Sequence, residues 1–220
     1  LHPVAHSFPT RRSSDLVSHA FAADMDNDGD LDIFAISGND AIIAWYENGN
    51  AWAKTNVSTS VDSASSALAV DMDGDGDLDV LSHSGANTTI AWYENGNAWA
   101  KTNISTTVDS ICSIYATDMD RDGDIDVLAT SYADDTIAWY ENGNTWAKAI
   151  ISDTAYDVNC VRVADINGDG DLDILSSSFF EDTISWYEHI PRDTDEDGLY
   201  DRDETSLYGT DLNDPDTDDD

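Results

Sequence analysis

A single 47-residue unit, repeated, makes up most of this 220-residue chain. Its most regular part is an acidic nonapeptide, written "DMDGDGDLD" in its second copy, and the segments between the nonapeptides repeat as well, as "IAWYENGN" does. A fixed period of 20 to 50 residues marks an architecture built from repeated supersecondary units. The four nonapeptides begin at Asp24, Asp71, Asp118 and Asp165.

Each repeat predicts four short strands and no helix. In the second copy the strands are expected at 67–70, 78–82, 89–93 and 99–105, separated by polar turn segments. Four strands in a repeat of this length are typical of a β-propeller blade. A parallel β-helix would need a nonapeptide period, which is absent, and a helical solenoid conflicts with the strand pattern. The expected fold is therefore all-β, a β-propeller of four-stranded antiparallel blades.

The third connection of each repeat predicts a β-hairpin. With Asn95-Gly96 at the centre of a type I′ turn, Trp92 would face Trp99 across two strands and pack into the core. A tryptophan pair could also form a sugar platform, but recurrence at a strand-pairing position favours packing. The equivalent pairs would be Trp45 with Trp52 and Trp139 with Trp146.

The fourth repeat is shorter than the others. His189, Ile190 and Pro191 replace its hairpin turn and outer strand, which leaves three full repeats and three strands of a fourth. We expect an incomplete ring taken from a larger propeller. A closed four-bladed ring is the alternative.

The first 16 residues do not follow the repeat. In the 47-residue register, "SFPTRRSSDL" at 7–16 stands where 54–63 reads "KTNVSTSVDS". This stretch resembles one reading frame through a laboratory sequencing adapter. A natural basic linker is the alternative, but similarity to the repeats resumes directly after Leu16. Residues 1–16 are therefore interpreted as a non-native segment.

Charge restricts the possible partners. The chain has 46 Asp and Glu against 9 Lys and Arg, a formal net charge of -37, yet 40% of its residues are apolar, as in a globular protein. Such a surface repels nucleic acid and anionic membranes. No run of 18 apolar residues is present, so we expect no membrane insertion. Cations are the expected partners.

The nonapeptide has the pattern of a cation-binding loop. Side-chain oxygens at positions 1, 3, 5 and 9 and a carbonyl at position 7 can surround one hard cation, while Gly at position 6 permits the sharp reversal. All-oxygen donors in this number favour Ca²⁺ over Zn²⁺, Cu²⁺ or Mg²⁺. A solvated acidic turn would explain one copy, but explains four copies poorly. The candidate ligands are Asp24, Asp26, Asp28, Asp30 and Asp32; Asp71, Asp73, Asp75, Asp77 and Asp79; Asp118, Asp120, Asp122, Asp124 and Asp126; and Asp165, Asn167, Asp169, Asp171 and Asp173. Of these, Asp77 and its equivalents would offer only the carbonyl and leave the side chain in solvent.

The loop and the "IAWYENG" hairpin together resemble the FG-GAP or VCBS-type repeat of integrin-α-like propellers over residues 17–190. This resemblance implies a usually seven-bladed propeller that binds calcium in these loops. It also implies an extracellular adhesion or recognition protein or a secreted bacterial protein.

A different acidic segment follows at 191–220. "DTDEDGLYDRDE" has the spacing of an EF-hand-type loop and, with the sequence after it, resembles thrombospondin type 3 repeats. A disordered acidic tail is the alternative. The candidate calcium ligands are Asp193, Asp195, Asp197, Asp201 and Glu204.

Two cysteines, Cys112 and Cys160, fall on equivalent strands of the third and fourth repeats, one register step apart. Alternation along a strand would place them on opposite faces. We expect two small buried residues rather than a disulfide.

The sequence favours a binding module over an enzyme. An active site is a unique constellation, whereas these acids recur in every repeat with metal-ligand spacing. We expect a calcium-binding secreted or cell-surface module for adhesion or recognition, with a protein or a glycan docking on loops that differ between repeats, such as 82–88 and 130–136. The alternatives are an accessory domain of a secreted polysaccharide-degrading enzyme and a passive spacer.

Overall fold

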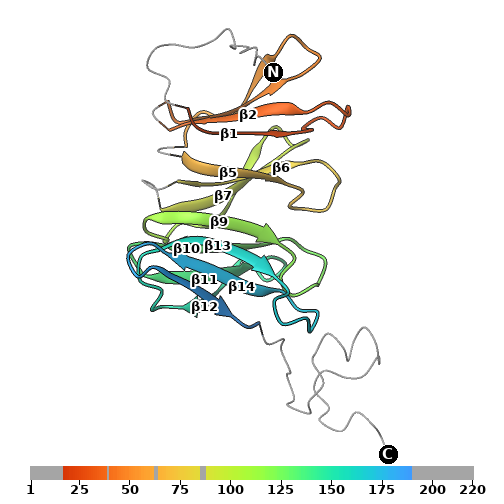
Figure 1. Cartoon of the computed structure of the whole chain (residues 1–220). Coiled ribbons are helices and arrows are strands. Elements are labelled where there is room, and N and C mark those ends of the chain that lie inside the picture. The colour runs from red at the N-terminus through yellow and green to blue at the C-terminus, as the bar shows by residue number, and fades with distance from the viewer. Residues whose placement is uncertain (1–16, 39, 62–63, 85–87, 190–220) are drawn as a thin grey trace, which may run out of the picture.

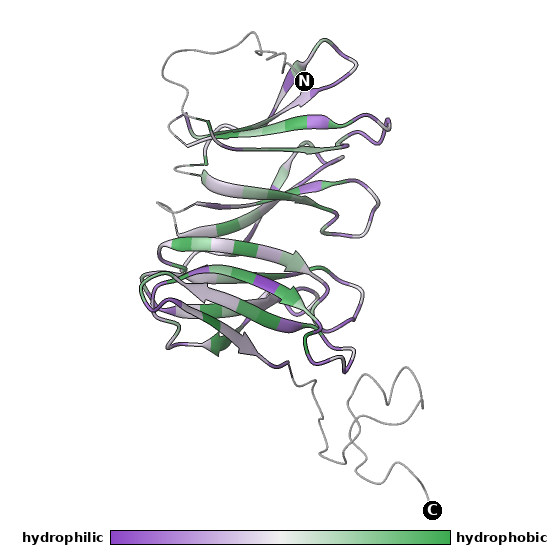
Figure 2. Ribbon diagram, viewed as in Figure 1, coloured by the Kyte–Doolittle hydropathy of each residue, from purple (hydrophilic) through white to green (hydrophobic). Residues whose placement is uncertain are grey.

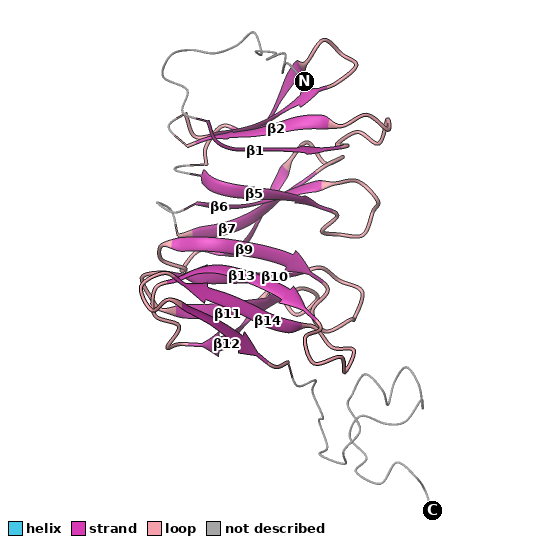
Figure 3. Ribbon diagram, in the orientation of Figure 1, coloured by secondary structure: helices cyan, strands magenta, loops and turns pink. Residues whose placement is uncertain are grey.

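The computed structural model describes residues 17–189 apart from 39, 62–63 and 85–87. The sequence predictions for 1–16 and for 191–220 lie outside this range. All regular secondary structure in the described residues is β-strand, as Figure 3 shows. No helix in this part of the chain is long and apolar enough to cross a membrane.

The strands form four antiparallel sheets, one for each repeat. Within each sheet the strands are hydrogen-bonded in chain order, and the last sheet has three strands where the others have four. This confirms the predicted fold, and the described part of the fourth repeat contains the three predicted strands. The strands are β1 (Val17–Ala23), β2 (Asp32–Ser37), β3 (Ile42–Glu47) and β4 (Ala53–Ser58); β5 (Ala64–Val70), β6 (Asp79–Ser84), β7 (Thr89–Glu94) and β8 (Ala100–Ser105); β9 (Ile111–Thr117), β10 (Asp126–Ser131), β11 (Thr136–Glu141) and β12 (Ala147–Ser152); and β13 (Val158–Ala164), β14 (Asp173–Ser178) and β15 (Thr183–Tyr187).

The sheets are arranged as the blades of a propeller. Their first strands lie side by side, because β1 contacts β5, β5 contacts β9 and β9 contacts β13. The other strands of each sheet follow outward in order. Figure 1 shows the first and last blades at opposite ends of the stack, so the described residues form an incomplete β-propeller and do not close into a four-bladed ring.

Apolar side chains between neighbouring blades form the core. Phe34 and Ile43 of the first blade pack in one cluster with Val80 and Tyr93 of the second, and all four are buried. Apolar positions alternate with polar ones along the strands in Figure 2, because successive side chains of a strand point to opposite faces. Each fully buried apolar side chain contributes about 1.5–3 kcal/mol to stability.

The hairpin that joins the third and fourth strands differs from the prediction. In the second blade Glu94 pairs with Ala100, so the connection has five residues instead of two, and Trp92 lies opposite Thr102 instead of Trp99. The prediction of cross-strand tryptophan pairs was therefore wrong. The first and third blades repeat this register, with Trp45 opposite Thr55 and Trp139 opposite Ala149.

The longer loop has a physical cause. Asn95 donates its backbone N–H to the Asp79 carboxylate at 2.7 Å, which holds the Asn-Gly pair against the acidic loop and away from the turn centre. The chain reverses later, where Ala98 and Trp99 have φ of 52° and 58° and Ala100 donates its N–H to the Asn97 carbonyl at 3.0 Å.

The tryptophans nevertheless pack against the core. Trp45 is buried, and Trp99 and Trp146 are half-buried against the clusters between the first and second and between the second and third blades. The predicted packing role is confirmed for these three, although only Trp45 is buried as predicted, and the packing arises through contacts between blades rather than within one hairpin.

The cysteines lie on β9 and β13, which are equivalent strands, and neither forms a disulfide. Cys160 is half-buried and Cys112 is exposed, so the prediction of burial was wrong for Cys112. Both line a hollow along the innermost strands.

Candidate cation-binding loops

The acidic loops connect the first and second strands of every blade. Asp24–Asp32 joins β1 to β2, and the other three loops take the same place in their blades. Since the first strands lie side by side, all four loops gather at one end of the propeller.

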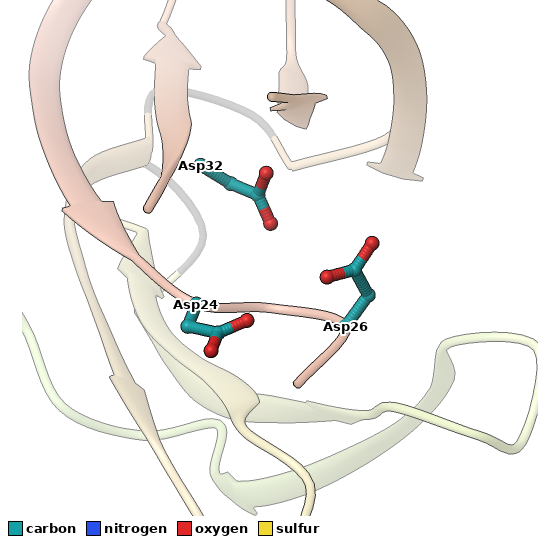
Figure 4. Close-up of side chains that lie close together, drawn as sticks. All are labelled: Asp24, Asp26 and Asp32. Carbon is teal, nitrogen blue, oxygen red and sulfur yellow. The ribbon is translucent and has the colours of Figure 1, made fainter. Parts of the chain in front are cut away.

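Three of these loops bring carboxylates together. Asp24, Asp26 and Asp32 each offer one oxygen, and these three oxygens lie within 4.8 Å of one another. Figure 4 shows the carboxylates of Asp26 and Asp32 turned toward each other with Asp24 beside them. Each of these clusters could hold a metal ion. The equivalent groups are Asp71, Asp73 and Asp79 in the second loop and Asp118, Asp120 and Asp122 in the third.

The fourth loop is different because Asn167 replaces the carboxylate at position 3. No cluster of three acidic side chains is found there among the described residues. The Asn167 amide donates to Asp169 at 2.7 Å and to Glu188 at 3.1 Å, so it already offsets part of the local negative charge.

Glycine at position 6 makes the reversal, as predicted. Gly29, Gly76, Gly123 and Gly170 have φ between 93° and 101°, a conformation that residues with a Cβ rarely adopt. A Cβ added at Gly29, Gly76 or Gly123 would meet no atom within 4 Å. The backbone conformation, not a lack of space, therefore requires glycine here.

The carboxylate at position 5 lies outside the cluster in the first two loops. Asp28 and Asp75 accept the backbone N–H of the residue two positions later, at 2.8 Å and 2.9 Å, as Asp122 also does in the third loop. This hydrogen bond shapes the second half of the loop. Among the described residues, a position-5 side chain joins a carboxylate cluster only in the third loop, at Asp122.

In the second and fourth loops the side chain at position 7 joins the preceding loop, which contradicts the prediction of a solvated side chain for Asp77 and Asp171, whereas Asp30 and Asp124 are exposed as predicted. Asp77 accepts a hydrogen bond from the Asn27 amide of the preceding blade at 2.7 Å. Asp171 is 6% exposed and lies 3.9 Å from the Arg121 guanidinium of the preceding loop. The sequence signal for these contacts is the residue at position 4 of the preceding loop. This residue is Asn27 in the first loop and Arg121 in the third, whereas the second and fourth loops have glycine there.

The aspartate at position 9 acts as a brace, a role that sequence reasoning missed. The Asp126 side chain is 1% exposed, and its two oxygens accept the backbone N–H of Met119 at 3.1 Å and of Asn142 at 2.7 Å. It thus connects the start of the acidic loop to the outer hairpin. The same pair of hydrogen bonds recurs at Asp32, Asp79 and Asp173.

The hairpin asparagine extends this brace to the next blade. The Asn95 amide donates to the carbonyl of Leu78 in its own loop at 3.1 Å and to that of Met25 in the preceding loop at 2.9 Å. Asn142 makes the equivalent pair of contacts. The signal for this role is the Glu-Asn-Gly sequence, which recurs in the first three repeats and is replaced at His189.

The electrostatics of the loops favour a cation. Burial raises the pKa of Asp79 and Asp126 to about 6, even though backbone N–H groups donate to both carboxylates. Burial and the negative charge of Asp122 raise the pKa of Asp120. One carboxylate oxygen of Asp118 is buried without a hydrogen-bond partner. The donor set is all oxygen, and the residues present therefore fit a hard cation.

The architecture defines a class of protein: a β-propeller built from repeats that each carry an acidic loop. The FG-GAP-like repeat family matches three overlapping segments, residues 24–82, 71–129 and 118–176, which together span more than half of the chain. The chain belongs to the FG-GAP-like repeat family.

Solved structures share this fold at low sequence identity. A lectin from Agrocybe aegerita, described as recognising non-reducing terminal N-acetylglucosamine, superposes with a TM-score of 0.53 and 17% identity over 74% of this chain. The chain spans about half of that lectin, 48% of its length. No curated protein sequence gave a significant match.

Two further structures are more distant. The Vibrio cholerae biofilm matrix protein Bap1 has a TM-score of 0.47 and 18% identity, with 80% of this chain and 31% of Bap1 covered. A protein from Lactobacillus plantarum has a TM-score of 0.42 and 12% identity, with 77% and 55% covered.

Proposed function

We propose that this chain is a calcium-stabilised, non-catalytic recognition module that works outside the cell and binds a glycan or a protein. The observation that carries the proposal is the contrast between its two ends. Acidic loops of one sequence pattern recur at one end. At the other end the loops between second and third strands differ, with Gly38, Tyr132 and Phe179 at the same repeat position. A constant scaffold with variable loops is the usual design of a binding protein.

Calcium is the cation that the loops fit best. Carboxylate and carbonyl oxygens on a flexible loop are the ligands that Ca²⁺ prefers, and Mg²⁺ demands a more rigid octahedral arrangement. We propose Asp24, Asp71 and Asp118 with the carboxylates clustered around them as the ligands, and the remaining loop aspartates as further donors. When bound, the ion would neutralise the carboxylates and fix the loop. The predicted loop at Asp193 to Glu204 lies outside the described residues and stays a prediction.

The proposed location outside the cell is supported by the calcium concentration that such loops need. Extracellular calcium modules bind with Kd values of about 10⁻⁴ to 10⁻³ M, a range that the cytosol does not supply. The lectin with the same fold gives a precedent for glycan recognition by such a scaffold. The acids recur in every blade, which supports a structural role for them over catalysis.

The recognition function is tested by binding measurements on the full chain in millimolar calcium. We expect binding to at least one glycan on an array or to an extracellular protein in a pull-down, and loss of this binding in chelator. Uniformly negative results with calcium present would instead favour a passive spacer.

We expect the fourth loop to bind calcium more weakly than the first three. Asn167→Asp adds the missing negative charge, and unit charges 4 Å apart attract by about 1 kcal/mol even in bulk water. The affinity of the weakest site should rise at least about fivefold in calorimetric titration. Asn103→Asp, on the exposed outer strand β8, adds the same charge away from the loops and should leave the titration unchanged. Equal effects of the two variants would contradict a site at the fourth loop.

A further inference from the structure

The innermost strands β1, β5, β9 and β13 line a hollow of about 670 Å³, a volume within the range of small-ligand sites. Its lining is unusual for this chain. None of the described residues that line it is acidic, although the chain has 46 Asp and Glu, while His19 and Arg162 are among the lining residues. Arg162 lies over the ring of Tyr115, 5.7 Å from its centroid. The hollow therefore differs in charge from the rest of the surface.

Four exposed aromatic side chains lie at the end of the propeller opposite the acidic loops. Tyr132 and Tyr156 are 50% and 54% exposed, and Phe179 and Phe180 are 68% and 69% exposed. The two phenylalanine rings meet edge to face at 5.4 Å. Contiguous exposed apolar patches often mark binding sites, and we call these four residues the aromatic rim.

Hydrogen bonds attach the aromatic rim to the mouth of the hollow. The Ser110 carbonyl accepts the N–H of Tyr132 at 3.0 Å and the thiol of Cys112, a lining residue, at 3.6 Å. Asp157 is 5% exposed and follows Tyr156 directly. Its carbonyl accepts the N–H of Phe179 at 3.3 Å.

A second set of contacts makes the rim continuous. The Asp157 carboxylate accepts the N–H of Phe180 at 3.1 Å. The backbone N–H of Asp157 donates to the Asp135 carboxylate at 3.2 Å. Asp135 belongs to the same loop as Tyr132, and Asn159, two residues after Asp157, lines the hollow. These contacts place the loops that carry the rim next to the strands that line the hollow.

The exposure of Tyr132 does not result from a position in the last described blade. Tyr132 belongs to the third blade, which has a blade on either side, and it is still half exposed. The equivalent residue of the first blade is Gly38. The aromatic side chains are thus a particular feature of the third and fourth blades, not of the repeat.

We propose that the hollow and its aromatic rim bind a neutral oligosaccharide, an inference that rests on the recognition function proposed above. Aromatic faces suit the apolar C–H faces of sugar rings, and Asn159, Ser113 and Arg162 offer hydrogen-bonding groups to sugar hydroxyls. The net charge of -37 and the exposed carboxylates of Glu181 and Asp182 beside the rim repel an anionic glycan. A hollow of this volume suits a small ligand better than the flat surface, about 800 Å² per partner, that a stable protein interface uses.

The test is calorimetric titration of the full chain in millimolar calcium with cellotriose, mannotriose and chitotriose, and with trigalacturonic acid as the anionic probe. We expect at least one neutral trisaccharide to bind. The double variant Tyr132→Gly and Phe179→Gly places at both positions the residue that the first blade has, and it should weaken binding at least tenfold. Tyr156→Asp, which copies Asp109 of the preceding repeat, should also weaken binding. Ile150→Ala, an exposed apolar position on β12, is the control and should bind as the parent does.

The outcomes separate this inference from the proposed function. Unchanged trisaccharide binding by the rim variants would place the glycan elsewhere and overturn the inference, while the recognition function would stand. Tighter binding of trigalacturonic acid, or binding of a protein partner with no neutral saccharide, would overturn it in the same way. Absence of every kind of binding would overturn both. Melting temperatures of the rim variants should equal that of the parent, because the substituted side chains are half or more exposed.

Discussion

Chelation of calcium is expected to lower the melting temperature of the full chain by about 20–40 °C. A ligand that binds only the folded state at a hundredfold excess over its Kd stabilises it by about 2.7 kcal/mol, so four loops contribute roughly 11 kcal/mol. This equals the whole stability of a typical domain, about 5–15 kcal/mol. At this chain length each kcal/mol shifts the melting temperature by about 2–4 °C. Thermal unfolding followed by circular dichroism, in about 10 mM calcium (roughly a hundredfold above a Kd of about 10⁻⁴ M) and in chelator, measures the difference.

Two controls make this result specific. Magnesium at the same concentration should restore little of the stability, because these loops suit a larger and less rigidly coordinated ion. The double variant Asp71→Asn and Asp73→Asn should remove about one site's share of the calcium effect, roughly 2–3 kcal/mol. A melting temperature that chelation does not change would contradict the calcium assignment.

The stability of the fold should depend on pH with opposite signs in chelator and in calcium. Burial raises the pKa of Asp79 and Asp126 to about 6 in the folded protein, above the ordinary value of 3.8. In chelator the folded state therefore binds a proton on each of these two carboxylates more tightly than the unfolded state does. The stability that this protonation contributes is lost as pH rises from about 4 through about 6. In calcium the carboxylates must be ionised to bind, so stability should rise over the same range.

The sequence was informative wherever the repeat itself specifies the structure. The period gave the blades, since every copy must bury the same apolar face against its neighbour. The spacing of Asp24 and Asp26 correctly placed two carboxylates in one cluster, because the glycine at position 6 allows the sharp reversal that a tight loop needs. These are local relations within nine residues, and a pattern can show them directly.

The errors share a cause, which is contact between distant residues. Asn95-Gly96 has the local signature of a two-residue turn, but a carboxylate 16 residues earlier holds its backbone. Asp77 was expected in solvent, and its partner lies 50 residues away on another blade. Cys112 was expected in the core, but its strand lines the central hollow. Pairing of β6 with β7 brings Asn95 to Asp79, and the radial packing of the blades brings Asp77 to Asn27 and Cys112 to the hollow.

Loss of the position-9 brace is expected to be the largest single-residue effect on stability. Asp126→Ala leaves the buried N–H groups of Met119 and Asn142 without an acceptor. Hydrogen bonds to a charged group contribute about 1.5–3 kcal/mol each, so the free energy of unfolding should fall by about 3–6 kcal/mol. The effect should be present in chelator as well as in calcium, because these donors belong to the backbone and not to a bound ion.

Urea denaturation of the full chain checks this expectation. Asp126→Asn keeps one carbonyl acceptor and nearly the same volume, so it should lose about half as much stability and stay folded if the alanine variant does not. Asp153→Ala removes the same charge from an exposed position and should change stability by less than about 0.5 kcal/mol. If Asp126→Ala and Asp153→Ala differ by less than about 1 kcal/mol, the brace contributes little, and the carboxylate at position 9 is present for the cation alone. A large loss confined to calcium buffer would lead to that same conclusion, because it would show that the side chain stabilises the fold only through the metal.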